Sequence, residues 1–173
     1  LRISADDRHF AHQDGTPFFW VGDTSWNGPL LSSKSDWELY LKERSRQKFN
    51  AVQWVTTQWR ASPEGDANKQ VAYTGTDKIV LNPAFFQRLD EKVDTMNQAG
   101  LVSVPVLLWA INAGSNPKVN PGVSLPEDQA ILLARYMVAR WSGNATAWIL
   151  AGDGNYRGEI AEKWKRIGRA VFG

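Results

Sequence analysis

Short apolar runs alternate along the chain with longer stretches in which apolar residues recur every three or four positions. The short runs predict β-strands, and the three-to-four spacing predicts amphipathic helices. The expected strands are 18–21, 50–57, 101–109 and 146–152. The expected helices are 35–48, 83–99, 125–141 and 159–171. Asp14-Gly15 lies between two β-rich runs and predicts a hairpin whose second half is the strand at 18–21, so the chain reads as a hairpin followed by four strand–helix units.

Polar residues mark where three of the helices are expected to begin. Ser35 and Glu38 have the spacing of a capping box, in which both side chains bind the first free N–H groups of a helix. The same spacing recurs at Ser124 and Glu127. Asn82-Pro83 predicts an asparagine cap followed by a proline in the first turn.

The alternation of strands and helices predicts an α/β fold of parallel βαβ units with right-handed crossovers. Two architectures fit, namely a doubly wound open sheet and part of a (β/α)8 TIM barrel. A doubly wound nucleotide-binding sheet has a glycine-rich phosphate loop after its first strand. This position reads GDTSWNGP, with neither that glycine pattern nor a phosphate-binding lysine. The sequence therefore favours the barrel.

Four strand–helix units make half of a barrel, because a complete one takes about 250 residues. The first and fourth strands of a half-barrel would expose unpaired edges, which natural proteins seldom leave open. We expect residues 1–173 to form the N-terminal half of a single barrel domain. A complementary C-terminal half-barrel is then expected as a second chain, a removed segment or a partner copy.

Composition and charge narrow the function classes. The 173 residues include 20 Lys and Arg against 18 Asp and Glu, without a basic cluster, so no nucleic-acid partner is expected. No apolar run approaches the roughly 18 residues of a membrane span. The absence of cysteine excludes disulfides and thiolate sites, and His9 and His12 lack ligand spacing, so we expect no metal and no cofactor. A secreted or periplasmic location is favoured over a cytoplasmic one.

Polar and aromatic side chains gather where the expected strands end, which is where active groups stand in a (β/α)8 barrel. Three of these strand ends carry a tryptophan. Hydrogen-bonding groups beside aromatic rings suit a sugar, whose hydroxyls need directional partners and whose C–H face packs on a ring. The alternative is a turn cap for Asp23 and a place in the core for each tryptophan. The candidate substrate-binding residues are Asp23, Trp26, Gln58, Trp59, Trp109, Asn155 and Tyr156.

The stretch AWILAGDGNY, residues 147–156, ends an apolar strand in an aspartate between two glycines. The strand would hold Asp153 still, while Gly152 and Gly154 would leave room for a ligand. Apolar neighbours would also desolvate the carboxyl group, which favours the protonated form that a general acid needs. Glu159 suits the capping of the next helix better than Asp153 does. Asp153 is therefore the candidate catalytic residue, with a turn cap as the alternative.

Three stretches, PFFWVGDTSWNGPL, KFNAVQWVTTQWR and AWILAGDGNYRGE, resemble the N-terminal half of the apiosidase-like glycoside hydrolases of family 140. The resemblance runs from about His9 to the C-terminus. It implies a (β/α)8 barrel, retaining hydrolysis of a poly- or oligosaccharide, and Asp153 as the general acid/base. It also implies that Asp23 and Trp26 lie in the substrate pocket. The nucleophile of the family is a Glu on a later strand, outside this chain, and retaining hydrolysis needs both carboxyl groups about 5–5.5 Å apart.

Two other functions stay open at this point. One is a carbohydrate-binding or assembly module without catalysis, which is favoured if these residues work alone, since the chain then has no nucleophile. The other is a barrel enzyme of another class, such as an isomerase or a metal-dependent hydrolase. No histidine pair or carboxylate cluster has the ligand spacing that such a metal enzyme would need.

Overall fold

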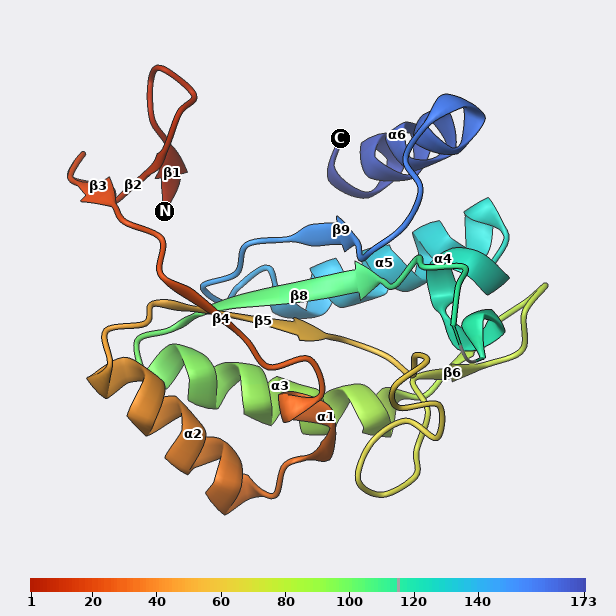
Figure 1. Cartoon of the computed structure of the whole chain (residues 1–173), viewed down its shortest axis with the longest axis horizontal. Coiled ribbons are helices and arrows are strands. Elements are labelled where there is room, and N and C mark those ends of the chain that lie inside the picture. Colours follow the sequence, from red (N-terminus) through yellow and green to blue (C-terminus); the bar gives the residue numbers. More distant parts are fainter. Residues whose placement is uncertain (115) are drawn as a thin grey trace.

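A four-stranded parallel sheet lies at the centre of the computed structural model, which describes residues 1–114 and 116–173 (Figure 1). The strands follow one another in the order of the chain, β4-β5-β8-β9. Their bounds are β4 (Gly22–Thr24), β5 (Ala51–Val55), β8 (Val102–Leu108) and β9 (Ile149–Ala151). Each neighbouring pair is parallel, which confirms the predicted α/β fold with four parallel strands in chain order.

A helix follows each of these strands and completes the βα units. The long helices are α2 (Lys34–Arg46), α3 (Pro83–Gln98), α5 (Glu127–Trp141) and α6 (Gly158–Phe172). Shorter elements lie in the connections, namely α1 (Gly28–Leu31), β6 (Tyr73–Thr74), β7 (Val80–Leu81), the 3-10 helix η1 (Pro117–Val119) and α4 (Pro121–Ser124). In Figure 1, α2 and α3 lie side by side below the sheet, while α5 packs on β8 and α6 packs on α5. Within the described ranges, no helix is both long enough and apolar enough to cross a bilayer.

The face of the sheet that meets the helices carries the larger core. Trp54 of β5 is fully buried, and its ring lies 5.4 Å from that of Trp141 on α5. The indole N–H of Trp54 donates to Ser103 Oγ at 3.0 Å, so the one polar atom of this side chain is satisfied. Burial of such large apolar side chains is the main source of stability in this layer, about 2–3 kcal/mol each.

The opposite face of the sheet carries a smaller and separate apolar cluster. Ala51, Val102 and Val104 are buried there, with Phe18 packed against them. Phe18 belongs to an antiparallel sheet of β1 (Arg2–Ile3), β2 (Phe10–Ala11) and β3 (Pro17–Phe18). This sheet lies near the N-terminal ends of the parallel strands in Figure 1. Because both faces of the central strands are largely covered, β5 and β8 are mainly apolar, with Gln53 in β5 and Ser103 in β8 as their polar residues.

The boundaries of several elements differ from the sequence predictions. The hairpin is confirmed, with Phe18 in its last strand as expected, but the first parallel strand is a separate element that starts at Gly22. The other parallel strands are shorter than expected, as is common when strand ends are read from sequence. Pro105 lies inside β8, opposite Trp54, and the register continues unbroken past it.

The predicted helix caps are confirmed in one case and wrong in two. Asn82 caps α3 and accepts a hydrogen bond from Phe85 N–H at 3.4 Å. The cap of α2 is Ser33 rather than Ser35, because α2 begins one residue before Ser35. Ser124 is the last residue of α4, its hydroxyl donates to Asn120 O, and α5 begins after Pro126 without a side-chain cap.

Candidate active site

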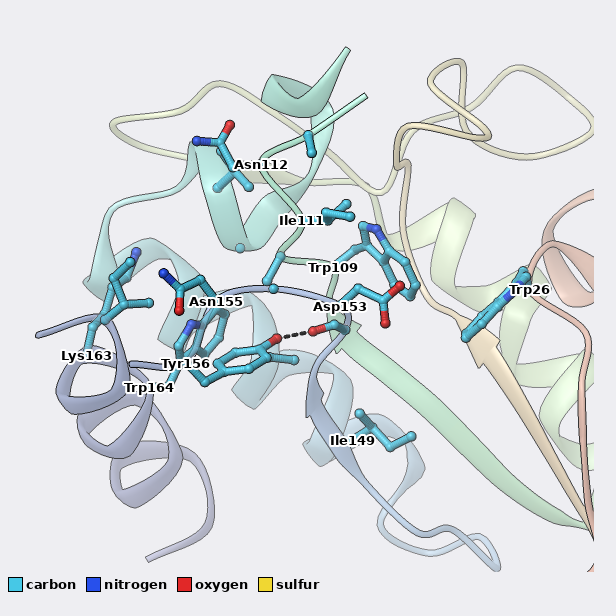
Figure 2. Close-up of a pocket in the computed structure, with 18 of the residues that line it drawn as sticks. Trp26, Trp109, Ile111, Asn112, Ile149, Asp153, Asn155, Tyr156, Lys163 and Trp164 are labelled. Carbon is cyan, nitrogen blue, oxygen red and sulfur yellow. Dashed lines mark hydrogen bonds between the residues drawn. The ribbon is translucent and has the colours of Figure 1, made fainter. Parts of the chain in front are cut away.

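A cavity of about 970 Å³ lies at the carboxyl ends of β8 and β9 (Figure 2). Its wall combines aromatic rings with amide and charged groups. The residues come from β5, β9, α4, α6 and the loops after β4, β8 and β9. Five of the eight site residues predicted from the sequence line it. These five are Asp153, Trp26, Trp109, Asn155 and Tyr156.

Asp153 stands in the loop that joins β9 to α6. Its carboxyl group faces the cavity from the side on which Trp109 and Trp26 lie (Figure 2). The expected desolvation is wrong for this chain, because Asp153 is exposed. The reason is that β9 is an edge strand, with β8 as its only partner among the described residues.

Gly152 lets the end of β9 press directly against an aromatic ring. A Cβ atom at Gly152 would lie 2.3 Å from Cε3 of Trp109, so no larger residue fits without a shift of the ring or the strand. Trp109 is only 2% exposed and also packs edge-on against Trp59. From the sequence, the space left by the missing side chain of Gly152 was expected to be available to a ligand. In the structure it is filled by Trp109, which fixes the backbone that carries Asp153.

The three tryptophans of the strand ends form one cluster. Trp59 and Trp109 are 4.6 Å apart between ring centroids, and Trp26 lies 5.2 Å from Trp109. Trp59 is 3% exposed and donates its indole N–H to Asn27 Oδ1, so it is a core residue and does not line the cavity. Trp26 is 36% exposed and presents its ring to the cavity. The cluster therefore consists of one accessible ring supported by two buried ones.

Asp23 does not line the cavity, contrary to the prediction. It lies inside β4, opposite Val52, whereas the next residue, Thr24, lies opposite Gln53, which does line the cavity. Since successive side chains of a strand point to opposite faces, Asp23 is directed at the helices. Its carboxylate accepts hydrogen bonds from Tyr40 Oη at 2.8 Å and from Arg44 Nε, both on α2.

The electrostatics of Asp23 are those of a structural ion pair. Partial burial opposes ionisation of Asp23, but the hydrogen bonds from Arg44 and Tyr40 outweigh it and hold the pKa of Asp23 below its usual value. Burial, reinforced by the carboxylate of Asp23, raises the pKa of Tyr40 to about 12. Asp23 thus fastens β4 to α2 as a carboxylate at neutral pH.

Gln58 is also placed away from the cavity. It is 6% exposed, its amide N–H donates to Tyr73 O at 3.0 Å, and its Oε1 accepts from Ala72 N–H at 2.9 Å. Both ends of the amide are used to hold the long loop that follows β5. The chain turns away from the sheet at this point, which is why a polar residue just after a strand is not available to a ligand.

Tyr156 and Asn155 lie on the loop after Asp153. The phenol of Tyr156 donates a hydrogen bond to Gly152 O, and its ring packs edge-on against Trp164 of α6 at 6.0 Å (Figure 2). Burial, with a smaller effect from the charge of Asp153, raises the pKa of Tyr156. The phenol is therefore protonated and acts as a donor at neutral pH.

Three polar residues of the cavity, Gln53, Asn112 and Lys163, are not among the candidates taken from the sequence. Gln53 is a polar residue at an inward position of an otherwise apolar strand, and strict alternation along β5 could have identified it. Lys163 belongs to the charged stretch 162–169 of α6, and no sequence signal distinguishes it from its charged neighbours.

The chemistry of this cavity rests on few ionisable groups. Among the described residues that line it, Asp153 is the one carboxylate, with Lys163 and Tyr156 as the other titratable side chains. The described part of the chain contains no group of three or more His, Asp or Glu residues that could hold a metal ion. The arrangement can transfer a proton through Asp153 next to an aromatic surface, but it has no second carboxylate for a double displacement.

The sequence and the fold were compared with known proteins. The family model described as "Apiosidase-like, catalytic domain" matches residues 4–173. No curated protein matches the sequence.

Several solved structures share the fold. A family 5 glycoside hydrolase from Bacteroides vulgatus has a TM-score of 0.78 at 18% identity, covering 98% of this chain and 36% of that protein. A second structure, described as a glycoside hydrolase, has a TM-score of 0.77 at 21% identity, covering 98% and 37%. An exo-β-1,4-mannosidase from an Opitutaceae bacterium has a TM-score of 0.62 at 15% identity, covering 99% and 32%. The present chain spans about a third of the length of these structures.

Proposed function

Since the chain belongs to the apiosidase-like catalytic-domain family, we propose that it supplies the general acid/base side of a glycoside-hydrolysing site. The observation that carries the proposal is the position of Asp153, a carboxylate at the end of a parallel strand that faces a cavity beside an accessible tryptophan ring. The substrate is a poly- or oligosaccharide, whose sugar ring stacks on Trp26. Asn155 lies where it can bind hydroxyl groups.

In the proposed reaction Asp153 acts twice. The protonated carboxyl group first donates its proton to the glycosidic oxygen as the bond to the anomeric carbon breaks, while a nucleophilic glutamate forms a covalent bond to that carbon. The Asp153 carboxylate then takes a proton from water, which attacks the anomeric carbon and releases the glutamate. The configuration at the anomeric carbon is retained because it is inverted twice.

The glutamate has to come from residues outside this chain. We propose that the four βα units are the N-terminal half of a (β/α)8 barrel and that a C-terminal half completes it. Two observations support this. Among the described residues, β4 and β9 each have a strand partner on one side only, and the structures that match nearly the whole chain are about three times its length. A completed barrel would also cover the exposed side of Asp153 and so provide the desolvation that the chain alone lacks. A secreted or periplasmic location is part of the proposal.

The test is Asp153→Asn in the protein with its C-terminal half present. Turnover of glycosides should fall at least about a hundredfold, because a positioned acid/base contributes roughly 10²–10⁴ in rate. Asp77→Asn is the matched control, since Asp77 is an exposed aspartate in the turn between β6 and β7. Hydrolysis at the wild-type rate by Asp153→Asn, with the control also active, would contradict the proposed role.

A non-catalytic carbohydrate-binding module is the second candidate. It is favoured by one observation, that the described lining of the cavity holds a single carboxylate. Calorimetry with oligosaccharides and a reducing-sugar assay on the same samples separate the two. Heat of binding without release of reducing ends supports the module, and release that depends on Asp153 supports the hydrolase.

A further inference from the structure

The loop that carries Asp153 is closed on itself by one side chain. The ladder between β8 and β9 ends where Gly152 N–H donates to Leu108 O at 3.0 Å. Beyond this point, the hydrogen bond from Tyr156 Oη to Gly152 O joins the two sides of the loop, with Asp153 between them. Figure 2 shows this bond as the link between the phenol and the backbone beside Asp153.

The surroundings of the Tyr156 phenol favour its hydrogen bond to Gly152 O. A Cβ atom at Gly154 would lie 3.0 Å from Tyr156 Oη, so the hydroxyl packs over the backbone of the loop. The ring is held edge-on by Trp164 of α6. Two contacts thus fix the loop at Gly152. Trp109 packs against this residue, and Tyr156 donates a hydrogen bond to its carbonyl oxygen.

We propose that Tyr156 is a positioning residue for Asp153 rather than a residue that binds substrate through its hydroxyl group. This inference rests on the proposed function, because it assigns the purpose of the positioning to proton transfer by Asp153. The phenol holds the loop closed, so the carboxyl group stays directed at the space beside Trp26 and Trp109. A carboxyl group that is free to leave this orientation transfers its proton less often at the moment the glycosidic bond breaks.

The kinetic test is Tyr156→Phe, which keeps the ring and removes the hydroxyl. We expect kcat to fall about tenfold with KM changed by less than about twofold, because orientation is lost but no substrate contact is. The loss of kcat should be greater for alkyl glycosides than for dinitrophenyl glycosides, since dinitrophenolate leaves without protonation. Tyr136→Phe is the matched control, because the hydroxyl of Tyr136 accepts a hydrogen bond from Arg140 on the same helix, α5. A tenfold rise in KM with unchanged kcat would overturn the proposal and assign the hydroxyl to substrate binding.

A second readout needs no activity. In this chain, three-bond NMR couplings about χ1 of Asp153 should report one rotamer in the wild type and in Tyr136→Phe, and averaged rotamers in Tyr156→Phe. The same couplings in wild type and Tyr156→Phe would overturn the proposal. If Asp153→Asn keeps full hydrolysis, the proposed function fails, whereas these couplings still decide whether Tyr156 orients Asp153.

Discussion

At each edge of the parallel sheet an aspartate directly follows a glycine, and the two aspartates have different surroundings in the structure. Gly22-Asp23-Thr24 forms β4 at one edge, and Gly152-Asp153-Gly154 follows β9 at the other. Asp23 is directed at α2 and held by Arg44 and Tyr40. Asp153 faces the cavity and makes no such ion pair in the described part of the chain.

The difference comes from position along the strand. Asp23 lies within the ladder, where alternation assigns it to the helix side. Asp153 lies beyond the last ladder residue of β9, where the loop and not the pleat decides its direction. A similar local sequence therefore gives a structural ion pair at one edge and a candidate acid/base at the other. Substitutions at the two edges test whether the aspartates differ in this way.

The largest change in stability is expected at the aromatic cluster. Trp59→Ala should destabilise the fold by about 3–5 kcal/mol, because it empties a buried site. Trp26→Ala should change stability much less, since this ring is 36% exposed, but it should weaken binding of an oligosaccharide roughly tenfold, or about 1.4 kcal/mol. Urea unfolding and calorimetry on both variants measure the two effects. Equal losses of stability would show that Trp26 is an ordinary core residue.

Gly152→Ala tests the contact that fixes Asp153. Because the new Cβ would lie 2.3 Å from Trp109, we expect a loss of about 1–3 kcal/mol in unfolding free energy, together with lower activity. Gly143→Ala is the control, since a Cβ there would meet nothing within 4 Å. Unfolding curves that coincide for wild type and Gly152→Ala would mean that the strand end is not held by this ring.

Asp23→Asn tests the other edge and should have the smallest effect. At pH 7 the variant should be less stable than wild type by about 1–2 kcal/mol, because the charge-assisted pair with Arg44 is lost. Its turnover should be retained. The pKa of Asp23 is lowered in the folded state, so its contribution is present above the unfolded value of about 3.9 and is lost as the pH falls through the folded value. The stability difference between the variant and wild type should therefore vanish in acid. A difference that persists at low pH would exclude the ion pair as its cause.

Sequence reasoning placed residues correctly where their position follows from the local pattern alone, whereas their chemical roles stay predictions. The order of strands and helices follows from hydrophobic periodicity, and Asp153, Trp26 and Trp109 follow from the rule that cavities form at strand ends. It failed for Asp23 and Gln58 because the true limits of β4 and the path of the loop after β5 decide which way those side chains point. These limits depend on pairing with distant strands. The apolar run 18–21 contributes Phe18 to the N-terminal hairpin as expected, but it does not form the first parallel strand, which starts at Gly22.

The most direct test of the central claim is chemical rescue of Asp153→Ala by azide, in the protein with the proposed C-terminal half-barrel present. With an activated aryl glycoside, turnover should fall at least about a hundredfold. Azide should restore much of it and give a glycosyl azide of retained configuration, because the anion attacks the covalent intermediate without needing a base. Asp23→Ala should show no azide effect. Turnover by Asp153→Ala at the wild-type rate would contradict the account. A loss of turnover that azide does not restore, with no glycosyl azide formed, would contradict it as well.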